Sequence, residues 1–150
     1  MNLFDTISDE IKSAMKAKDR NKLAVLRNVK KYFLEALTAP GADDTLADEE
    51  ALKIIQKLVK QSKDSAAIYQ EQGREDLAKE ELDQVDVLET FLPKQLSDEE
   101  LQVRIEELVK RLGASSPKDM GKVMGAATKE LAGIAEGRKI ASTVKDILNR

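Results

Sequence analysis

The stretch that decides the fold of this chain reads Ser116-Pro117-Lys118-Asp119-Met120-Gly121-Lys122-Val123-Met124-Gly125. Ser116 is a favourable N-cap residue, and Pro117 suits the first position of a helix. The carboxylate of Asp119 lies where it favours the positive start of a helix. The stretch therefore predicts a helix that begins here.

The predicted helix has two contrasting faces, because successive residues turn by about 100° around the axis. One face is apolar and carries Met120, Val123, Met124, Ala127 and Leu131. The opposite face carries Lys118, Lys122, Gly125 and Lys129, with Gly121 at its edge. Each helical glycine costs about 1 kcal/mol relative to alanine. Bare backbone beside lysines suits close approach of an anionic partner such as a phosphate backbone. A solvated face whose glycines admit a neighbouring helix explains the pattern equally well.

The composition excludes several classes of function. The 150 residues are 41% hydrophobic and 35% charged, a balance typical of globular proteins, and they include no Cys, His or Trp. Disulfides, thiol nucleophiles, Cys/His zinc sites and histidine bases are thereby excluded. No apolar run approaches the roughly 20 residues of a membrane span, and the first residues lack a secretory signal. We therefore expect a cytoplasmic protein that has no membrane partner.

Charge is distributed unevenly along the chain, whose net charge is −3. Residues 1–92 carry 14 basic and 19 acidic side chains, whereas residues 109–150 carry 9 basic and 4 acidic ones. A basic end on an acidic chain points to an anionic partner for that end.

Apolar periodicity predicts an all-α fold with no strand. The predicted helices cover residues 3–16, 20–37, 46–72, 75–91 and 98–112, then one from 116 and a last one from 136–137. Met15, Ser62 and Leu82 fall on the inward sides of their helices. Arg20, Arg27, Lys30 and Lys31 form a second basic stripe, which we interpret as a solvated face.

Turn and capping signals separate the helices. Pro40-Gly41 marks a loop, after which Asp44 or Thr45 is expected to cap the third helix. Gly73, Gly113 and Gly133 are expected to end helices or break the chain. Pro93 ends the fourth helix, and Ser97 and Glu100 form a capping box for the fifth. We therefore predict an N-terminal helical domain over 1–93 and a C-terminal three-helix domain over 94–150.

Five short motifs resemble the YqeY-like family, and the resemblance extends over essentially the whole chain. The motifs are residues 14–19 with 26–27, residues 59–65, residues 73–77, residues 92–97, and residues 113–116 with 119–125. The resemblance implies a multi-helix N-terminal part. It also implies a C-terminal part similar to the tail domain of the B subunit of glutamine-dependent tRNA amidotransferase, which helps to hold the tRNA.

The resemblance implies an RNA-binding role for residues of the C-terminal part. Gly121, Lys122 and Gly125 match the family motif, and Gly137 with Arg138 lie in the next turn. With the neighbouring lysines, the candidate RNA-binding set is Lys118, Gly121, Lys122, Gly125, Lys129, Gly137, Arg138 and Lys139. The chain departs from the family pattern at two positions. Ile134 replaces a basic residue, which removes a phosphate contact, and Glu136 replaces an aspartate that would cap the last helix well.

Three hypotheses of function remain. The first is a module that binds tRNA or another structured RNA by shape and charge, since the basic tail contains no aromatic residue for base stacking. The second is carbon–nitrogen ligation with glutamine as amide donor, or an accessory role in it, as the family resemblance implies. The third is a protein-interaction module that receives a partner helix on the glycine face.

No residues with catalytic chemistry are evident in the sequence. It lacks a phosphate-binding glycine loop of the P-loop kind. We interpret Glu80-Glu81 and Glu106-Glu107 as solvated helix faces, and Ser62, Ser65 and Ser115 as helix-surface or loop residues. The sequence therefore predicts no catalytic residue, no cofactor site and no metal site.

Overall fold

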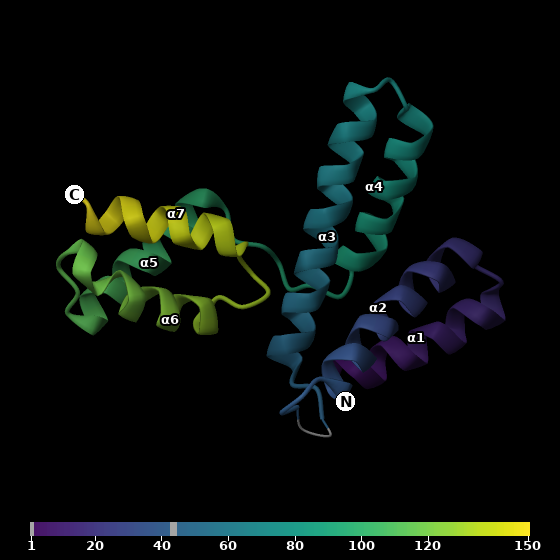
Figure 1. The fold of residues 1–150 in the computed structure, drawn as a ribbon, viewed down its shortest axis with the longest axis horizontal. Helices are drawn as coiled ribbons and strands as arrows, with labels where there is room; N and C mark the ends of the chain where they lie inside the picture. The colour runs from purple at the N-terminus through teal and green to yellow at the C-terminus, as the bar shows by residue number, and fades with distance from the viewer. Residues whose placement is uncertain (1, 43–44) are drawn as a thin grey trace. The chain divides into compact units, whose positions relative to one another are not determined.

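The computed structural model describes residues 2–42 and 45–150, and within them every regular element is helical (Figure 1). The all-α prediction is confirmed. The elements are α1 (Leu3–Ala17), α2 (Arg20–Thr38), α3 (Asp48–Glu71), α4 (Glu75–Glu89), α5 (Asp98–Leu112), the 3₁₀ turn η1 (Pro117–Asp119), α6 (Met120–Glu130) and α7 (Gly137–Leu148). None of the helices in this described part is long and apolar enough to cross a membrane.

The chain forms two compact units, one that runs to Leu92 and one from Pro93 to Arg150. The N-terminal unit consists of two helical hairpins, α1 with α2 and α3 with α4 (Figure 1). α2 contacts both helices of the second hairpin, and α1 contacts α3. The short connections between neighbouring helices explain the antiparallel pairing.

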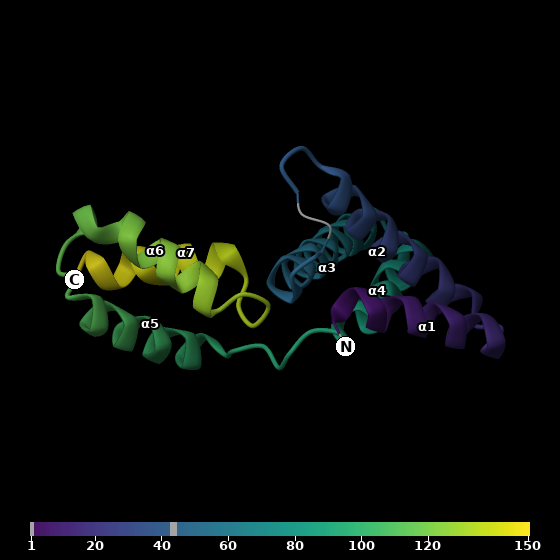
Figure 2. The ribbon, with the colours of Figure 1, turned by 90° about the horizontal axis from the view of Figure 1, so that it is seen from below.

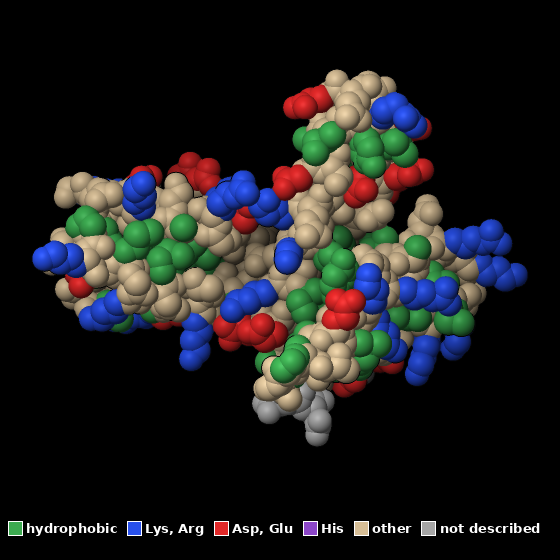
Figure 3. Space-filling view, viewed as in Figure 1, with side chains coloured by type: hydrophobic (Ala, Val, Ile, Leu, Met, Phe, Trp, Pro, Cys, Tyr) green, Lys and Arg blue, Asp and Glu red, His purple; other side chains and the backbone are tan. Residues whose placement is uncertain are grey.

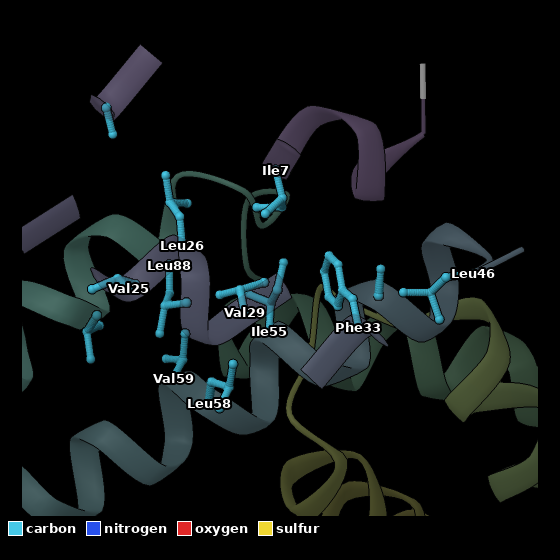
Figure 4. Packing of buried hydrophobic residues seen from close by; sticks show 13 residues of the cluster. Ile7, Val25, Leu26, Val29, Phe33, Leu46, Ile55, Leu58, Val59 and Leu88 are labelled. Carbon is cyan, nitrogen blue, oxygen red and sulfur yellow. The ribbon is translucent and has the colours of Figure 1, made fainter. Parts of the chain in front are cut away.

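The core of the N-terminal unit is built around α2 and α3 (Figure 4). Phe33 is fully buried, and its ring lies 6.3 Å from the ring of Phe4 on α1. Ile7 of α1 and Ile55 of α3 are also fully buried, and Leu88 brings α4 into the same cluster. Each such side chain contributes about 1.5–3 kcal/mol by leaving water. The two hairpins are therefore held together by one hydrophobic core.

The start of α3 differs from the prediction. Ala47 is its N-cap and makes no side-chain cap bond, so Thr45 does not cap the helix, and Asp44 lies outside the described residues. Leu46 is buried in the core, which keeps the chain extended before the helix begins. The Oδ1 atom of Asp48 instead accepts a hydrogen bond of 2.8 Å from the backbone N–H of Leu3, so it joins the starts of α1 and α3.

Two apolar residues that we expected to face inward are exposed. Met15 is 53% exposed in the last turn of α1, and Leu82 is 40% exposed on α4. Both predictions are wrong because an apolar stripe is buried only as far as a partner helix covers it. Periodicity identifies the stripe but not the extent of its cover.

The C-terminal unit packs α5, α6 and α7 around a second core (Figure 2). Its most deeply buried side chains include Leu101, Ile105, Val123, Ala127, Leu131, Ile140 and Val144. The Ser97–Glu100 capping box begins α5, and Gly113, with φ +66°, ends it. Both signals act as predicted.

The segment before α5 is anchored to the turn between α6 and α7. Gln95 donates a side-chain hydrogen bond of 2.7 Å to the carbonyl of Gly133, and the backbone N–H of Leu96 donates one of 2.8 Å to the carbonyl of Ile134. Gly133 has φ +81°, a left-handed conformation that favours glycine. Gly133 therefore breaks the chain as predicted, and its turn also receives the incoming segment.

Candidate nucleic-acid interface

The entrance to α6 is shaped by a carboxylate. The helix begins with the 3₁₀ turn η1, and Asp119 accepts hydrogen bonds from the backbone N–H groups of Ser115 at 2.9 Å and Ser116 at 3.4 Å. The Ser115 bond, helped by the Ser116 bond and by the charge of Lys122, lowers the pKa of Asp119. Asp119 thus satisfies N–H groups that precede the helix, where a negative charge is favoured.

The two faces of α6 have the polarity that its spacing predicts. Val123, Ala127 and Leu131 are buried in the core of the C-terminal unit, and Met120 and Met124 pack against that core. The opposite face is exposed and carries Gly121, Lys122, Gly125 and Lys129, and Lys118 is exposed in η1. We call these five residues the glycine–lysine face.

The glycines of this face have no role in packing. A Cβ atom added at Gly121 or Gly125 would meet nothing within 4 Å among the described residues, and neither glycine has a positive φ. Gly137, in the first turn of α7, is equally open. No described helix of the C-terminal unit makes use of the space above these three glycines. Any close approach that they allow must come from outside this unit.

The cations near these glycines differ in whether they already contact a carbonyl or a carboxylate of the protein. Lys122 donates a hydrogen bond of 3.0 Å from Nζ to the carbonyl of Leu112 at the end of α5, and Nζ of Lys139 lies 3.4 Å from a carboxylate oxygen of Asp98. Within the described part of the chain, Lys118, Lys129 and Arg138 form no ion pair. Lys122 therefore has a structural role at a helix C-terminus, where cations are stabilising. The three uncommitted cations are the better candidates for an external anion.

The start of α7 reflects the two departures from the family pattern. Glu136 is the N-cap residue but makes no side-chain cap bond. Ile134 packs against the core of the C-terminal unit, so this position serves stability. Gly137, Arg138 and Lys139 are all exposed in the first turn.

The charge of the C-terminal unit is more balanced than the basic tail suggested. Residues 93–150 carry 11 basic and 9 acidic side chains, because the acidic residues of α5 belong to the same unit. Arg111 forms an ion pair with Glu130 and Arg150 forms one with Glu106. On the face seen in Figure 3, the Lys and Arg side chains of this unit are spread out and not gathered in one patch. Any attraction for an anion is therefore local.

Basic residues also gather in the N-terminal unit. Residues 2–38, which include the α1–α2 hairpin, carry 8 basic and 5 acidic side chains, whereas residues 45–92 carry 6 and 12. Figure 3 shows this segregation, with Lys and Arg side chains over the α1–α2 hairpin. Some of these cations are already engaged, since Lys22 pairs with Glu10 at 3.0 Å and Lys30 lies 5.9 Å from the centre of the Phe4 ring.

Sequence reasoning missed Gln95 and the partner of Lys122. Both residues lie in motifs that we singled out, but their contacts are 38 and 10 residues away along the chain. Every residue has a backbone carbonyl, so the sequence does not show which carbonyl a side chain will contact, and neither contact could be predicted from spacing.

The architecture defines the class of the protein: an all-helical chain of two compact units, the second of which exposes a helix with glycines and lysines. The chain belongs to the YqeY-like protein family, whose model matches residues 4–148. The five motifs of the sequence analysis lie within that range.

Two curated relatives are yeast proteins named "Altered inheritance of mitochondria protein 41, mitochondrial". The one from Vanderwaltozyma polyspora is 32% identical over 109 residues, which cover 71% of this chain and 58% of the relative. The one from Clavispora lusitaniae is 26% identical over 131 residues, which cover 86% of this chain and 74% of the relative. Those names place the relatives in mitochondria, and the cytoplasmic location that we expect for this chain stays a prediction.

Proposed function

We propose that this protein binds tRNA or another structured RNA through its C-terminal unit, by contacts of the glycine–lysine face and the first turn of α7 with the phosphate backbone. One observation carries the proposal. Gly121, Gly125 and Gly137 occupy exposed helical positions that neither the backbone conformation nor the packing of the fold requires.

Helical glycine is unfavourable by about 1 kcal/mol relative to alanine. Gly121 and Gly125 therefore weaken α6, and Gly137 leaves the first turn of α7 equally open, with no gain within the fold. Lys118 and Lys129 flank the α6 glycines along the helix, and Arg138 follows Gly137 directly. This combination of bare backbone and uncommitted cations suits the phosphate oxygens of a nucleic acid.

Recognition by shape and charge fits the composition of this unit. Residues 93–150 contain no Phe, Tyr or Trp, so base stacking on aromatic rings has no support there. Phosphate contacts give binding that depends steeply on salt, with each contact contributing about one to the slope of log K against log salt.

The experiment compares binding of labelled tRNA to the full chain and to a Lys118→Ala/Lys129→Ala double variant over a range of salt concentrations. These two lysines are preferable to Lys122, whose loss also removes the bond to the Leu112 carbonyl. We expect the variant to bind more weakly and its salt slope to fall by about two. A Lys12→Ala/Lys57→Ala variant removes the same charge from exposed sites of the N-terminal unit and serves as control.

Equal loss in the two variants would mean that net charge, and not this face, attracts the RNA. Absence of binding even at low salt would reject the proposal and favour a protein partner on the glycine–lysine face. Carbon–nitrogen ligation, with glutamine as amide donor, is the alternative that the family resemblance suggests. Release of ammonia from glutamine by the pure protein would favour it.

A further inference from the structure

A polar cleft in the N-terminal unit is lined by residues of α2, α3 and α4. It has a volume of about 210 Å³. Its polar lining consists of Asn28, Gln61, Ser62, Ser65, Glu81 and Gln84, with Tyr32 adding a ring and a hydroxyl, and we call it the amide cleft. Its apolar lining comes from the hydrophobic core, through Val25, Leu58 and Leu88.

Ser62 is the most informative residue of the amide cleft. The residue is only 8% exposed, so its place on the inward side of its helix is confirmed and its interpretation as a helix-surface residue is wrong. It lines the cleft and makes no side-chain hydrogen bond with the described residues. None of the fully buried side-chain N or O atoms of the described residues lacks a hydrogen-bond partner. The Ser62 hydroxyl, which makes no bond within the described part of the protein, is therefore reached from the cleft and is available to whatever occupies it.

The other polar side chains of the cleft are less buried than Ser62, since Asn28 and Gln61 are exposed and the rest are half-buried. Asn28, Gln61, Ser65, Glu81 and Gln84 make no side-chain hydrogen bond within the described part of the chain, although they surround one small space. Convergent polar groups above an apolar floor are typical of ligand sites. The cleft thus offers three amide groups, two serine hydroxyls, one phenol hydroxyl and one carboxylate to a guest.

The charge of the lining selects the kind of guest. No Lys or Arg lines the amide cleft, and Glu81 is half-buried without an ion-pair partner among the described residues. A neighbouring cleft shares Asn28 and Gln84 with this one and is also lined by Glu80 and Asp83. Asp83 is paired with Lys79 at 2.9 Å, whereas Glu80 has no such partner in the described residues. An anionic guest would face uncompensated carboxylates, whereas a cationic one would neutralise them.

We propose that the amide cleft binds a small organic cation, an alkylammonium or a guanidinium group carried on a short methylene chain. The group has only N–H donors, which match the carboxylate of Glu81 and the amide and hydroxyl oxygens around it. The methylene chain covers Val25, Leu58 and Leu88, as the stems of lysine and arginine cover apolar surface. The guest is either a free amine or a Lys or Arg side chain of a partner protein. This proposal is independent of RNA binding, because the cleft lies in the N-terminal unit.

The test uses the full chain and two kinds of probe, agmatine as a free cation and the end-blocked peptide Gly-Arg-Gly as a protein-borne one. Binding is followed by calorimetry and by the shifts of the backbone amide signals of Ser62, Ser65 and Gln84. We expect saturable binding of at least one probe with shifts at these residues, and the better probe identifies the source of the cation. Glutarate, which has a similar length and the opposite charge, should not bind.

Variants distinguish binding in the amide cleft from general attraction between charges. Glu81→Gln should weaken binding about tenfold because it removes the counter-ion, and Ser62→Ala should weaken it several-fold while leaving the fold intact. Asp86→Asn also removes one negative charge from α4, but outside the cleft, and should leave the affinity for the probe unchanged. Binding of neither probe, or equal weakening in Glu81→Gln and Asp86→Asn, would overturn the proposal.

Discussion

At the scale of single residues, Gly121 and Gly125 are glycines that the fold does not require and that a binding partner would explain. Gly73 ends α3 with φ +71°, a conformation that an L side chain rarely adopts. Gly121 and Gly125 have ordinary helical backbones and open space above them. The same residue type is therefore structural at the first position and dispensable to the fold at the other two.

This contrast predicts opposite effects of alanine. Gly125→Ala should stabilise the C-terminal unit by about 1 kcal/mol, because alanine is the better helix former, and should weaken RNA binding about tenfold. Gly73→Ala should destabilise the N-terminal unit by about 1 kcal/mol and leave RNA binding unchanged. Urea unfolding and tRNA titration of each variant provide the measurements. If Gly125→Ala gained stability and kept full affinity, the argument from the glycines would fail.

Glu136 provides a second prediction at this scale. It occupies the N-cap of α7 without capping it. Aspartate is among the best N-cap residues because its shorter side chain reaches the free N–H groups of the first turn. Glu136→Asp should therefore raise the free energy of unfolding by about 0.5–1 kcal/mol in urea titrations. Glu136→Gln, which leaves the cap empty, should show no comparable gain.

At the scale of elements, most helix boundaries could be predicted because the signals that set them are local. Ser97 and Glu100 begin α5 and Gly113 ends it, each through contacts within a few residues along the chain. The start of α3 could not be predicted, because the burial of Leu46 depends on helices that are distant in sequence. The exposure of Leu82 was missed for the same reason.

The capping box of α5 predicts a dependence of stability on pH. The Ser97 hydroxyl, which also accepts a hydrogen bond from the Glu100 backbone N–H, and the Ser97 backbone N–H, which donates to the Glu100 carboxylate, lower the pKa of Glu100 in the folded state. The unfolded chain therefore binds more protons than the folded chain near pH 4. The contribution of Glu100 to the free energy of unfolding is fully present above the unfolded pKa and is lost as the pH falls through the folded pKa.

Glu100→Gln tests this dependence because glutamine accepts the same hydrogen bond without titrating. We expect a smaller loss of thermal stability between about pH 5 and pH 3 than in the parent chain, since one titrating group near pH 4 is removed. Glu99→Gln, which removes a neighbouring carboxylate outside the capping box, is the matched control. Identical pH profiles for the parent and Glu100→Gln would remove the capping box from the explanation.

At the scale of the whole molecule, the sequence pattern overstated the basic character of the candidate interface. The tail of residues 109–150 is strongly basic, but folding places it beside α5, whose carboxylates reduce the net charge of the unit. The amide cleft was invisible for a related reason, since its lining comes from three helices that become neighbours only in the folded chain. Spacing shows which face of one helix is apolar, but not which polar residues meet between helices.

The last prediction concerns the independence of the C-terminal unit. Residues 93–150 have their own hydrophobic core, and the anchors of the incoming segment, Gln95 on Gly133 and Leu96 on Ile134, are contained within them. A fragment of residues 93–150 should therefore unfold cooperatively, as monitored by circular dichroism, because it retains every element that covers its core.

Comparison with a shorter fragment makes this prediction specific. A fragment of residues 98–150 lacks both anchors and the N-cap Ser97, and each lost hydrogen bond contributes about 1 kcal/mol. It should therefore be less stable by about 2–3 kcal/mol. The longer fragment should also bind tRNA within about twofold of the full chain, with the same salt slope. A longer fragment that folds but does not bind would show that the N-terminal unit supplies part of the RNA surface, and the cations of the α1–α2 hairpin would then be the residues to substitute.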